Sequence, residues 1–195
     1  ELYLHPDYRE VLDVLDMQLV QYGSALIQRR QTFAEELGEI VHRIHSQLSG
    51  GQEEMELKYE PNVTVDAFAQ MLFANRERDM RLKTTATGPH RDDICFMNGD
   101  IDIRRFGSQG QQRTAALSLK LSEIELVKEE LNDTPILLLD DVLSELDKHR
   151  QNYLLDSIDN IQTIITCTGL DEFVNHRFSI NKIFHIKNGH AVNAN

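Results

Sequence analysis

Two adjacent carboxylates, Asp140 and Asp141, directly follow the apolar run 136–139. A buried parallel strand that ends in paired acids can deliver its carboxylates to a metal-bound nucleotide at the carboxyl edge of a sheet. In a nucleotide-hydrolysing site, the first acid would hold Mg²⁺, directly or through water, and the second would orient or deprotonate the attacking water. A strand that runs into an acidic surface loop would give the same letters.

A second candidate for chemistry is the segment 106–114, Phe-Gly-Ser-Gln-Gly-Gln-Gln-Arg-Thr, which lies directly ahead of a predicted long helix. Ser108 and the neighbouring glycines at a helix amino end leave backbone N–H groups free, and these form an anion site by geometry and by the helix dipole. An ordinary cap, with Ser108 serving the helix and Gly107 the turn, explains the same residues. The two interpretations are compatible.

A long helix is predicted ahead of both sites. Apolar residues recur at three- and four-residue spacing from 8 to 48 without a proline, although Gly23 and Gly38 weaken the pattern. An unbroken helix of this length would be roughly 60 Å long, which exceeds the diameter of a small domain. Two alternatives follow: the helix projects as an arm, or it breaks near one glycine into a hairpin of two ordinary core helices.

The remaining pattern predicts short strands and helices. Asn98 and Gly99 give a strong hairpin signal between two of the strands. Alternation of strand, helix and strand between 130 and 170 predicts a parallel βαβ unit, and we place a boundary near residue 83 between a helical lobe, 1–83, and the remainder, 84–195. The predicted strands are 56–60, 84–87, 93–97, 102–106, 136–139, 162–167 and 183–186, with a last short strand after a turn at 188–189; the predicted helices are 65–82, 111–130, 148–157 and a short piece at 171–175.

Composition and charge narrow the class of protein. The formal net charge of −12 argues against a whole surface that grips nucleic acid, but a local basic face stays open, because phosphate contacts are local. Each basic cluster is more often a solvated surface pair or a complement to a helix dipole than a DNA contact. The candidates for DNA binding are Arg29, Arg30, Arg76, Arg78 and Arg81, with the pair Arg104 and Arg105 as a further basic cluster.

The sequence gives no sign of a membrane or secreted protein. It has no run of about 20 apolar residues, as a membrane span would require, and its first residues lack the basic start and cleavage site of a signal peptide. Cys95 and Cys167 are far apart, form no C-x-x-C pair and sit in apolar, strand-like contexts. We therefore expect both thiols to be buried, in a protein of the reducing cytoplasm.

The two candidate sites come in an informative order. A Ser-x-Gly-Gln loop opens a helix, an apolar strand then ends in two acids, and Ser-Glu-Leu-Asp follows at 144–147. This order resembles the signature loop, Walker B strand and D-loop of ATP-binding-cassette heads. The detailed wording of 107–114 and 137–147, with Thr-Gly-Pro-His-Arg-Asp-Asp at 87–93, closely resembles the RecF family of bacterial DNA replication and repair proteins. The resemblance is strong over 84–193 and weaker over the helical first part.

The resemblance implies roles for both sites. The loop at 108–111 would contact the γ-phosphate of ATP bound to a partner subunit. Asp140 would serve Mg²⁺ and Asp141 would activate the attacking water; most transporter ATPases have glutamate there, so the shorter acid implies slow hydrolysis. The loop residues concerned are Ser108, Gln109, Gly110 and Gln111.

Two further elements carry implied roles. Ser144, Glu145 and Asp147 would form the D-loop at a dimer interface. Transporter ATPases also place a histidine near the γ-phosphate, after the strand that follows. In this sequence Thr168 is the nearest polar substitute, which makes it a candidate phosphate sensor and puts any histidine-type sensing in doubt.

For the fold, the resemblance implies an α/β protein: a partial ATP-binding-cassette head, built from a parallel βαβ unit plus antiparallel strands, with a helical arm lobe. For the function, it implies ATP and Mg²⁺ as cofactors, an ATP-dependent homodimer, and clamping of DNA at gaps where single- and double-stranded DNA meet. RecR and RecO would be partners, and RecA would be the recombinase that is loaded. Another SMC-like ATPase head and an interaction domain without nucleotide function stay open as alternatives.

One part of such a site is missing from the sequence. There is no G-x-x-x-x-G-K-[ST] loop, which would supply backbone N–H groups and a lysine to the β- and γ-phosphates. We therefore expect the chain to correspond to the carboxyl-terminal part of a longer protein, and to be unable to bind or hydrolyse ATP by itself. Leu-Ser-Gly-Gly-Gln at 48–52 spells the transporter signature, but glycines just past a helix are carboxyl caps, so we expect no nucleotide contact there.

Overall fold

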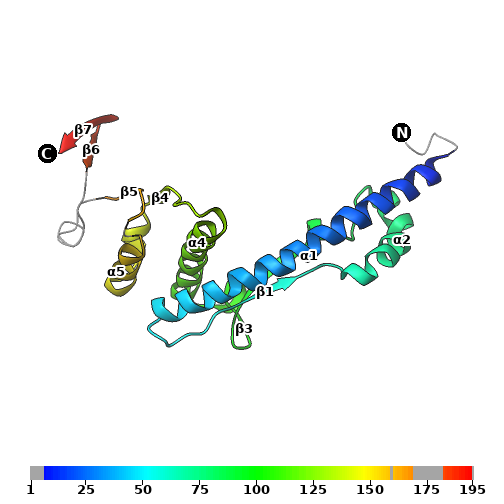
Figure 1. Cartoon of the computed structure of the whole chain (residues 1–195), viewed down its shortest axis with the longest axis horizontal. Helices are drawn as coiled ribbons and strands as arrows, with labels where there is room; N and C mark the ends of the chain where they lie inside the picture. Colours follow the sequence, from blue (N-terminus) through cyan, green and yellow to red (C-terminus); the bar gives the residue numbers. More distant parts are fainter. Residues whose placement is uncertain (1–6, 159, 169–181, 195) are drawn as a thin grey trace. The chain divides into compact units, whose positions relative to one another are not determined.

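The computed structural model describes residues 7–158, 160–168 and 182–194 of the chain. The chain forms two compact units, residues 1–135 and 136–195, and each is described by itself. The first unit, shown in Figure 1, contains α1 (Tyr8–Leu48), β1 (Glu56–Glu60), α2 (Val65–Leu82), η2 (Pro89–Arg91), β2 (Asp93–Asn98), β3 (Ile101–Asp102), α3 (Ile103–Phe106) and α4 (Gln109–Leu131). The second contains β4 (Leu137–Asp140), η3 (Val142–Glu145), α5 (Lys148–Ser157), β5 (Thr163–Thr166), β6 (Ile183–Lys187) and β7 (His190–Ala194).

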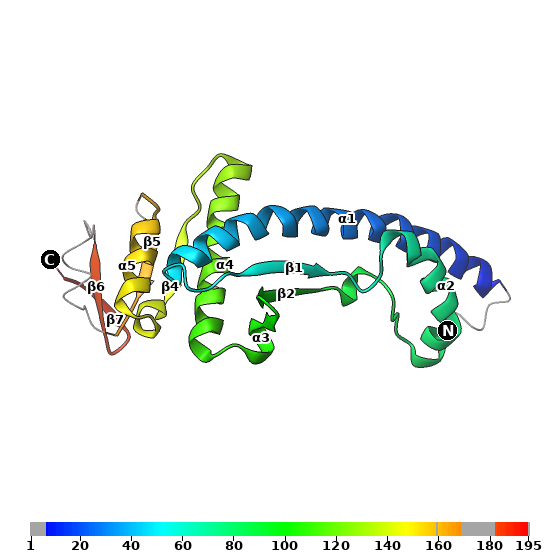
Figure 2. The same cartoon turned by 90° about the horizontal axis from the view of Figure 1, so that it is seen from below.

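The first part of the chain forms one long helix and not a hairpin of two helices. α1 runs unbroken for 41 residues, and Figure 2 shows it as one rod, with β1 beside it and α2 near its amino-terminal half. Gly23 lies inside this helix because a side chain has little room there: a Cβ would lie 2.4 Å from Cε1 of the Phe68 ring. The glycine that weakens the helical pattern is therefore a packing residue and not a break.

The carboxyl end of α1 confirms that the sequence 48–52 is a helix cap. Gly50 and Gly51 follow the helix with positive φ angles of 66° and 74°. The Gly51 N–H donates to the Ser46 carbonyl at 2.7 Å, as in a carboxyl-terminal capping motif.

An antiparallel sheet in the order β1-β2-β3 packs beside α1. Pairing runs from Glu56 opposite Met97 to Glu60 opposite Asp93. One core lies between α1, this sheet and α4, and a second joins α1 to α2. The buried residues of the first core are Ala34, Leu37, Val41, Met55, Leu57, Ile103 and Ala115, and those of the second are Ile27, Val63, Phe68 and Leu72. The first core contains residues from both sides of residue 83; the boundary between lobes placed there stays a prediction.

The strand predicted at 84–87 is wrong, because this segment is a loop held by side chains. The Ala86 N–H donates to Oδ2 of Asp79 at 3.1 Å, and Asn75 Nδ2 donates to the Thr87 hydroxyl at 2.9 Å. The Asp79 carboxylate thus accepts from a backbone N–H that a strand ladder would otherwise use, and the Asn75 amide holds the Thr87 side chain.

The strand predicted at 102–106 is also largely wrong. β3 stops at Asp102, whose carboxylate accepts from the Arg104 N–H at 2.9 Å and caps the short helix α3. The hairpin predicted at Asn98-Gly99 is present, with Asn98 opposite Ile101 and Gly99 at a positive φ of 57°.

The second unit contains the predicted parallel βαβ unit. β4 and β5 pair in parallel, from Leu137 opposite Thr163 to Asp140 opposite Thr166, and α5 lies in the connection between them. β6 and β7 form a hairpin around Asn188 and Gly189. Parallel and antiparallel strands therefore combine with helices, which confirms the α/β class. The helical piece predicted at 171–175 lies outside the described residues.

Two composition-based expectations have different outcomes. Cys95 is buried in β2, as predicted, and burial raises the pKa of its thiol. Cys167 is exposed, contrary to prediction, because it follows the last residue of β5 and so lies beyond the strand ladder. Among the described helices, none is long and apolar enough to cross a membrane.

Candidate functional site

The carboxyl end of β4 presents the paired acids. Asp140 is the last residue of β4 and lies opposite Thr166, the last residue of β5. The Thr166 hydroxyl donates a hydrogen bond to Oδ1 of Asp140, and the Asp141 N–H donates to the Thr166 carbonyl at 3.1 Å. Because parallel strands end at the same edge of a sheet, one threonine fixes the side chain of the first acid and the backbone of the second.

Asp141 has an unusual backbone conformation for a residue with a side chain. Its φ of 52° and ψ of 18° lie in the left-handed region, which Asp and Asn visit more readily than most residues. The Ser144 hydroxyl donates to the Asp141 carbonyl at 2.8 Å and so helps to hold the turn into η3. Asp141 itself is exposed, so its backbone is fixed while its carboxylate stays accessible to a reactant.

Asp147 caps α5. Its Oδ1 accepts from the N–H groups of His149 and Arg150, each at 3.0 Å, and the Arg150 guanidinium pairs with its other oxygen. The hydrogen bond from the Arg150 N–H, supported by the Arg150 side chain, lowers the pKa of Asp147. A helix cap therefore accounts for this acid within the chain. The D-loop roles of Asp147, Ser144 and Glu145 stay predictions.

The phosphate-sensor residue named from sequence lies close to, but outside, this hydrogen-bond network. Thr168 is exposed in a bend two residues beyond β5, and its sensor role stays a prediction. Sequence reasoning missed Thr166, which contacts both acids. Thr166 could have been found from the parallel pairing expected of a βαβ unit. In such a pair, the residue that ends the second strand lies beside the residue that ends the first.

The loop ahead of α4 forms a reciprocal cap. The Gln111 N–H donates to the Ser108 hydroxyl oxygen at 3.2 Å, and the Ser108 N–H donates to Oε1 of Gln111 at 2.8 Å. Gln109 and Gly110 between them are exposed, and a Cβ at Gly110 would meet only Ser108 Oγ, at 3.9 Å. This helix start is therefore rigid and open to an approaching group. It belongs to the first unit, whereas the acids belong to the second.

A stripe of small polar residues anchors α4 behind this loop. Thr114, Ser118 and Ser122 are fully buried, and each hydroxyl donates to the carbonyl four residues earlier, at 2.8, 2.7 and 2.6 Å. The imidazole Nδ1 of His45 in α1 lies 3.0 Å from Ser118 Oγ. The Ser118 hydroxyl donates its proton to the Thr114 carbonyl, so its oxygen can only accept from His45. The hydrogen bond therefore places a proton on Nδ1 of His45.

Two of the five arginines named for DNA binding are held by carboxylates. Arg76 Nη2 lies 2.7 Å from Asp13 Oδ1 and 2.5 Å from Asp16 Oδ2, and hydrogen bonds to these two acids raise its pKa. Arg30 Nη1 lies 3.0 Å from Oδ2 of Asp92. Short charge-assisted bonds of this kind commit both guanidinium groups to the fold.

The other three arginines are more accessible. Arg29 Nη2 lies 3.8 Å from Glu130 Oε1, with both side chains largely exposed. Arg78 and Arg81 are exposed near the end of α2, and no carboxylate of the described residues forms an ion pair with either. The DNA-binding roles of all five arginines stay predictions.

Asp92 ties the segment after α2 to the rest of the first unit. Its side chain is 3% exposed. It accepts from Arg30, from the Tyr59 hydroxyl and, through Oδ1, from the Asn62 N–H at 2.9 Å. Burial, with the hydrogen bond to Asp92, raises the pKa of Tyr59 to about 12, so the phenol stays a donor at neutral pH. The backbone of this segment is therefore firmly anchored.

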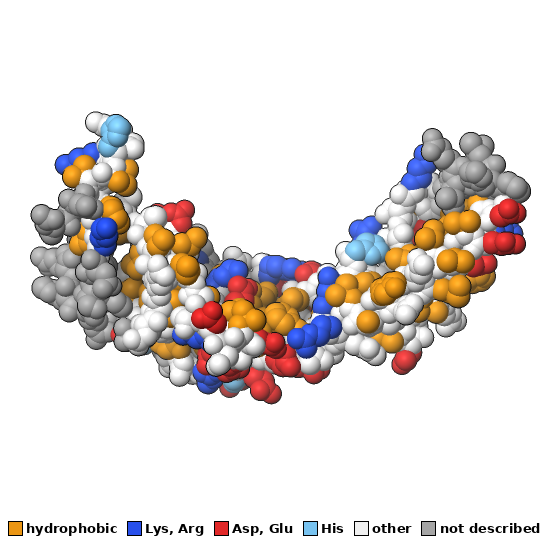
Figure 3. All heavy atoms as spheres, turned by 45° about the horizontal axis from the view of Figure 1, so that its top comes forward, with side chains coloured by type: hydrophobic (Ala, Val, Ile, Leu, Met, Phe, Trp, Pro, Cys, Tyr) orange, Lys and Arg blue, Asp and Glu red, His pale blue; other side chains and the backbone are white. Residues whose placement is uncertain are grey.

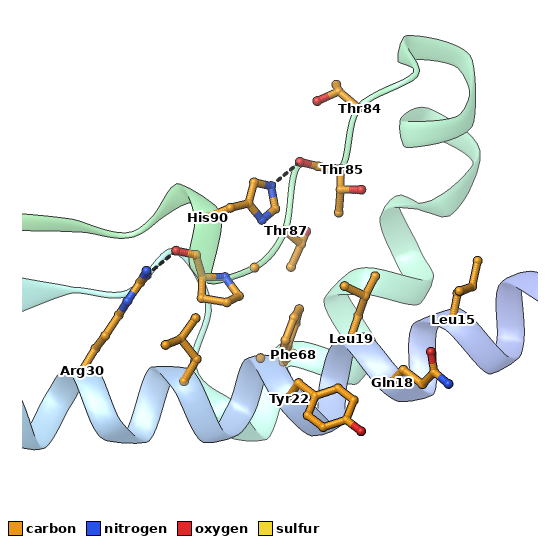
Figure 4. Close-up of a pocket in the computed structure, with 14 residues that line it drawn as sticks. Leu15, Gln18, Leu19, Tyr22, Arg30, Phe68, Thr84, Thr85, Thr87 and His90 are labelled. Carbon is orange, nitrogen blue, oxygen red and sulfur yellow. Dashed lines mark hydrogen bonds between the residues drawn. The ribbon is translucent and has the colours of Figure 1, made fainter.

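A groove of about 840 Å³ runs between α1 and this segment. Figure 4 shows Leu15, Leu19 and Tyr22 along the α1 side, with Thr85 and His90 on the opposite rim. The α1 side chains stay exposed by 43%, 48% and 69%, respectively. Figure 3 shows hydrophobic side chains, in orange, gathered over α1 and α2. Nothing in the described residues covers this groove.

No protein-family model matches the chain. The DNA replication and repair protein RecF of Lachnospira eligens is 56% identical over 95% of this chain and 51% of its own length, and that of Agathobacter rectalis is 56% identical over 97% and 52%. The chain matches the carboxyl-terminal half of RecF. A solved structure of the recombination mediator protein RecF with ATP, from the RecFOR pathway, matches 95% of this chain and 51% of its own chain, with a TM-score of 0.81 and 32% identity.

The chain spans about half the length of the curated relatives that it matches. It corresponds to their carboxyl-terminal half, which confirms the expectation drawn from the missing phosphate loop. The relatives argue against one alternative left open by the sequence, another SMC-like head, because both are RecF proteins. The other alternative, an interaction domain without nucleotide function, stays open.

The acids of this RecF-like chain fit a magnesium ion that is held mostly by water and phosphate. Mg²⁺ takes oxygen ligands and usually binds through one or two carboxylates plus waters and phosphate oxygens. Asp140 offers a carboxylate at an exposed strand end, oriented by Thr166. Among the described residues, no group of three or more His, Cys, Asp and Glu side chains could hold a metal by itself.

Proposed function

We propose that the chain is the carboxyl-terminal half of an ATP-dependent DNA clamp that acts in recombinational repair. ATP would join two copies of the whole protein, and hydrolysis would release them. The relatives at 56% identity are DNA replication and repair proteins, and the solved neighbours are recombination mediators with ATP or an ATP analogue bound. Those properties belong to the relatives and are the basis of this proposal.

The observation that carries the proposal is the pairing of Asp140 and Thr166 at the carboxyl end of a parallel βαβ unit. Ligands of α/β sheets bind outside the carboxyl ends of their strands. A hydroxyl that orients the carboxylate at that edge is expected of a metal-nucleotide site, because outer groups of this kind fix the ligand geometry. A plain acidic surface loop would not require the threonine.

In this proposal the two acids have different tasks. Asp140 would hold Mg²⁺ through its carboxylate, which the hydrogen bond from Thr166 to Oδ1 orients. Mg²⁺, when bound, neutralises the charge that develops on the phosphates. Asp141 orients and deprotonates the attacking water, since its carboxylate is exposed while its backbone is pinned by Thr166 and Ser144. The shorter reach of aspartate compared with glutamate favours slow turnover, as suits a switch.

The capped start of α4 would serve the nucleotide of the other subunit. Ser108 and Gln111 already hydrogen-bond each other, so little ordering entropy remains to be lost when a phosphate arrives. Gly110 leaves the surface open beside the helix amino end, where N–H groups and the dipole favour an anion. A site shared in this way makes dimerisation depend on ATP.

The partners follow from the same relatives. The solved structure's RecFOR pathway suggests RecO and RecR as partners of the whole protein. We propose gapped duplex DNA as the ligand of the closed dimer, loading of RecA as the outcome, and the cytoplasm as the location. The phosphate loop would come from the other half of the protein, so the 195-residue chain alone should give no binding heat with Mg-ATP in calorimetry.

Sedimentation of the whole protein tests the proposal. We expect a monomer without nucleotide, a dimer with Mg-ATP, and a dimer that outlasts the wild-type dimer in the Asp141→Asn variant, because binding is kept and hydrolysis is lost. A dimer whose stability is the same with and without ATP, in both proteins, would remove the ATP switch.

A further inference from the structure

A rigid basic segment covers the end of α2 and the connection from α2 to β2. It comprises residues 78–91, with the sequence Arg-Asp-Met-Arg-Leu-Lys-Thr-Thr-Ala-Thr-Gly-Pro-His-Arg. This segment contains four Lys and Arg residues and only one carboxylate, Asp79. The whole chain, by contrast, has a net charge of −12. We call it the basic segment and ask what it could bind.

Ion pairing distinguishes these cations from five other cations of the first unit. Arg30, Arg43, Arg76, Arg104 and Lys120 each lie within 3.0 Å of a carboxylate oxygen. Arg78, Arg81, Lys83 and Arg91 are exposed and have no carboxylate partner among the described residues. The single acid of the segment, Asp79, is half-buried, and its Oδ2 accepts from the Ala86 N–H at 3.1 Å. The segment therefore carries a net positive charge at the surface.

Hydrogen bonds fix the backbone of this segment at several points. Asn62 Oδ1 accepts from the Gly88 N–H at 3.0 Å, the Arg30 guanidinium donates to the Pro89 carbonyl, and His90 Nε2 lies 2.7 Å from the Thr85 carbonyl. Figure 4 shows Arg30 reaching up from α1 to the underside of the loop, with Thr84 on the side away from the helix. Gly88 has a φ of 136°, which a side chain would strain.

Rigid support and free donors together favour an anionic ligand. Lys83 follows α2 in the left-handed conformation, and Arg91 Nη2 lies 3.4 Å from the Thr84 hydroxyl at the other end of the loop. Cations and hydroxyls are the groups that contact nucleic-acid phosphates, and they position a protein on DNA without reading its sequence. A donor set held in place before binding loses little entropy when phosphates arrive.

We propose that the basic segment is a phosphate-backbone contact of the DNA clamp, made by Arg81, Lys83 and Arg91. The proposal rests on the proposed function and assigns the DNA contact to residues other than Arg30 and Arg76. Those two arginines form ion pairs within the fold, Arg30 with Asp92 and Arg76 with Asp13 and Asp16. Because the contacts are to phosphate, they strengthen binding to any DNA sequence and weaken as salt rises.

The test measures the salt dependence of DNA affinity in the whole protein, with Mg-ATP and a gapped duplex. The variant Arg81→Gln, Lys83→Gln, Arg91→Gln removes three unpaired cations. The matched control, Arg43→Gln, Lys58→Gln, Lys120→Gln, removes three exposed cations that pair with Glu125, Glu56 and Glu123. Each phosphate contact contributes about 0.9 to the slope of log affinity against log salt, so the first variant should flatten the slope by about two to three and the control by less than one.

Three outcomes would overturn the inference. A first variant with the wild-type slope shows that the segment does not meet phosphate, while the clamp itself stands. Equal flattening in both variants shows a general charge effect and also removes the segment from the site. A wild-type protein that does not bind the gapped duplex at all sinks the proposed function, and the inference with it.

Discussion

His45 Nδ1 and Ser118 Oγ lie 3.0 Å apart, with both residues fully buried, and join the arm helix α1 to the helix that starts at Ser108. The hydrogen bond links two elements separated by more than 70 residues in sequence. A buried polar pair of this kind is costly to break, because the group left behind loses its partner and cannot reach water.

Replacing His45 should therefore destabilise the first unit. We expect His45→Leu to lower the free energy of unfolding by about 1–3 kcal/mol, as for a buried hydroxyl left without its donor. His45→Asn, whose amide can take the place of the Nδ1 donor, should recover part of that loss. Urea denaturation measures both, and the exposed His149→Asn serves as a control. Equal stability of His45→Leu and wild type would show that the bond contributes nothing.

Two glycines of α1 should respond in opposite directions to alanine. At Gly23 the new Cβ would lie 2.4 Å from the Phe68 ring, so overpacking should cost about 1–3 kcal/mol. At Gly38 the nearest atom would be the Leu57 carbonyl oxygen, at 3.7 Å, so Gly38→Ala should stabilise the helix by up to about 1 kcal/mol. Melting temperatures of the two variants test this difference. If Gly38→Ala lowers the melting temperature as much as Gly23→Ala does, contact with the Phe68 ring does not explain the cost of a side chain at Gly23.

Gly110→Ala should separate folding from function. A Cβ at this position meets only Ser108 Oγ, at 3.9 Å, so the variant should fold and melt at or slightly above the wild-type temperature, because alanine favours a helix. The same methyl group would stand where the other subunit's phosphate must approach. We expect the whole protein with Gly110→Ala to stay monomeric with Mg-ATP in sedimentation. A normal ATP-dependent dimer would take Gly110 out of the shared site.

Thr166 gives a sharper test of the acid pair than either acid does. Thr166→Val keeps the shape and removes the hydroxyl that holds Asp140, so the steady-state ATPase rate of the whole protein should fall by roughly 10- to 100-fold, as for other groups that orient a metal ligand. Thr166→Ser should restore most of the rate. Thr163→Val, at the other end of β5, is the matched control and should be unchanged. The prediction fails if both valine variants behave alike.

Local signals made much of the fold predictable. The apolar spacing of 8–48 predicted α1, and the helix predicted at 148–157 is α5, because such patterns act within a few residues. The order of strand, helix and strand gave the βαβ unit and placed Asp140 at the carboxyl end of its strand. The reciprocal cap of Ser108 and Gln111 could likewise be expected from residue types three positions apart.

Long-range partners could not be predicted in this way. Whether Arg76 faces DNA or Asp16 depends on how α2 packs on α1, which the sequence of α2 alone does not contain. The loop at 84–87 is rich in threonine, as strands often are, but its Ala86 N–H donates to Asp79 and its Thr87 side chain is held by Asn75. The same holds for Thr166, whose importance appears only when the register of β5 against β4 is known.

The central claim is that each nucleotide site uses the acids of one subunit and the Ser108–Gln111 loop of the other. Mixing two inactive variants of the whole protein, Gly110→Ala and Asp141→Asn, tests it most directly. In a two-fold dimer, each molecule that pairs one variant with the other has one intact site of two. The mixture should therefore recover ATPase activity that neither variant has alone, up to about half of the wild-type rate if every dimer is mixed. A mixture no more active than either variant alone would contradict the shared site.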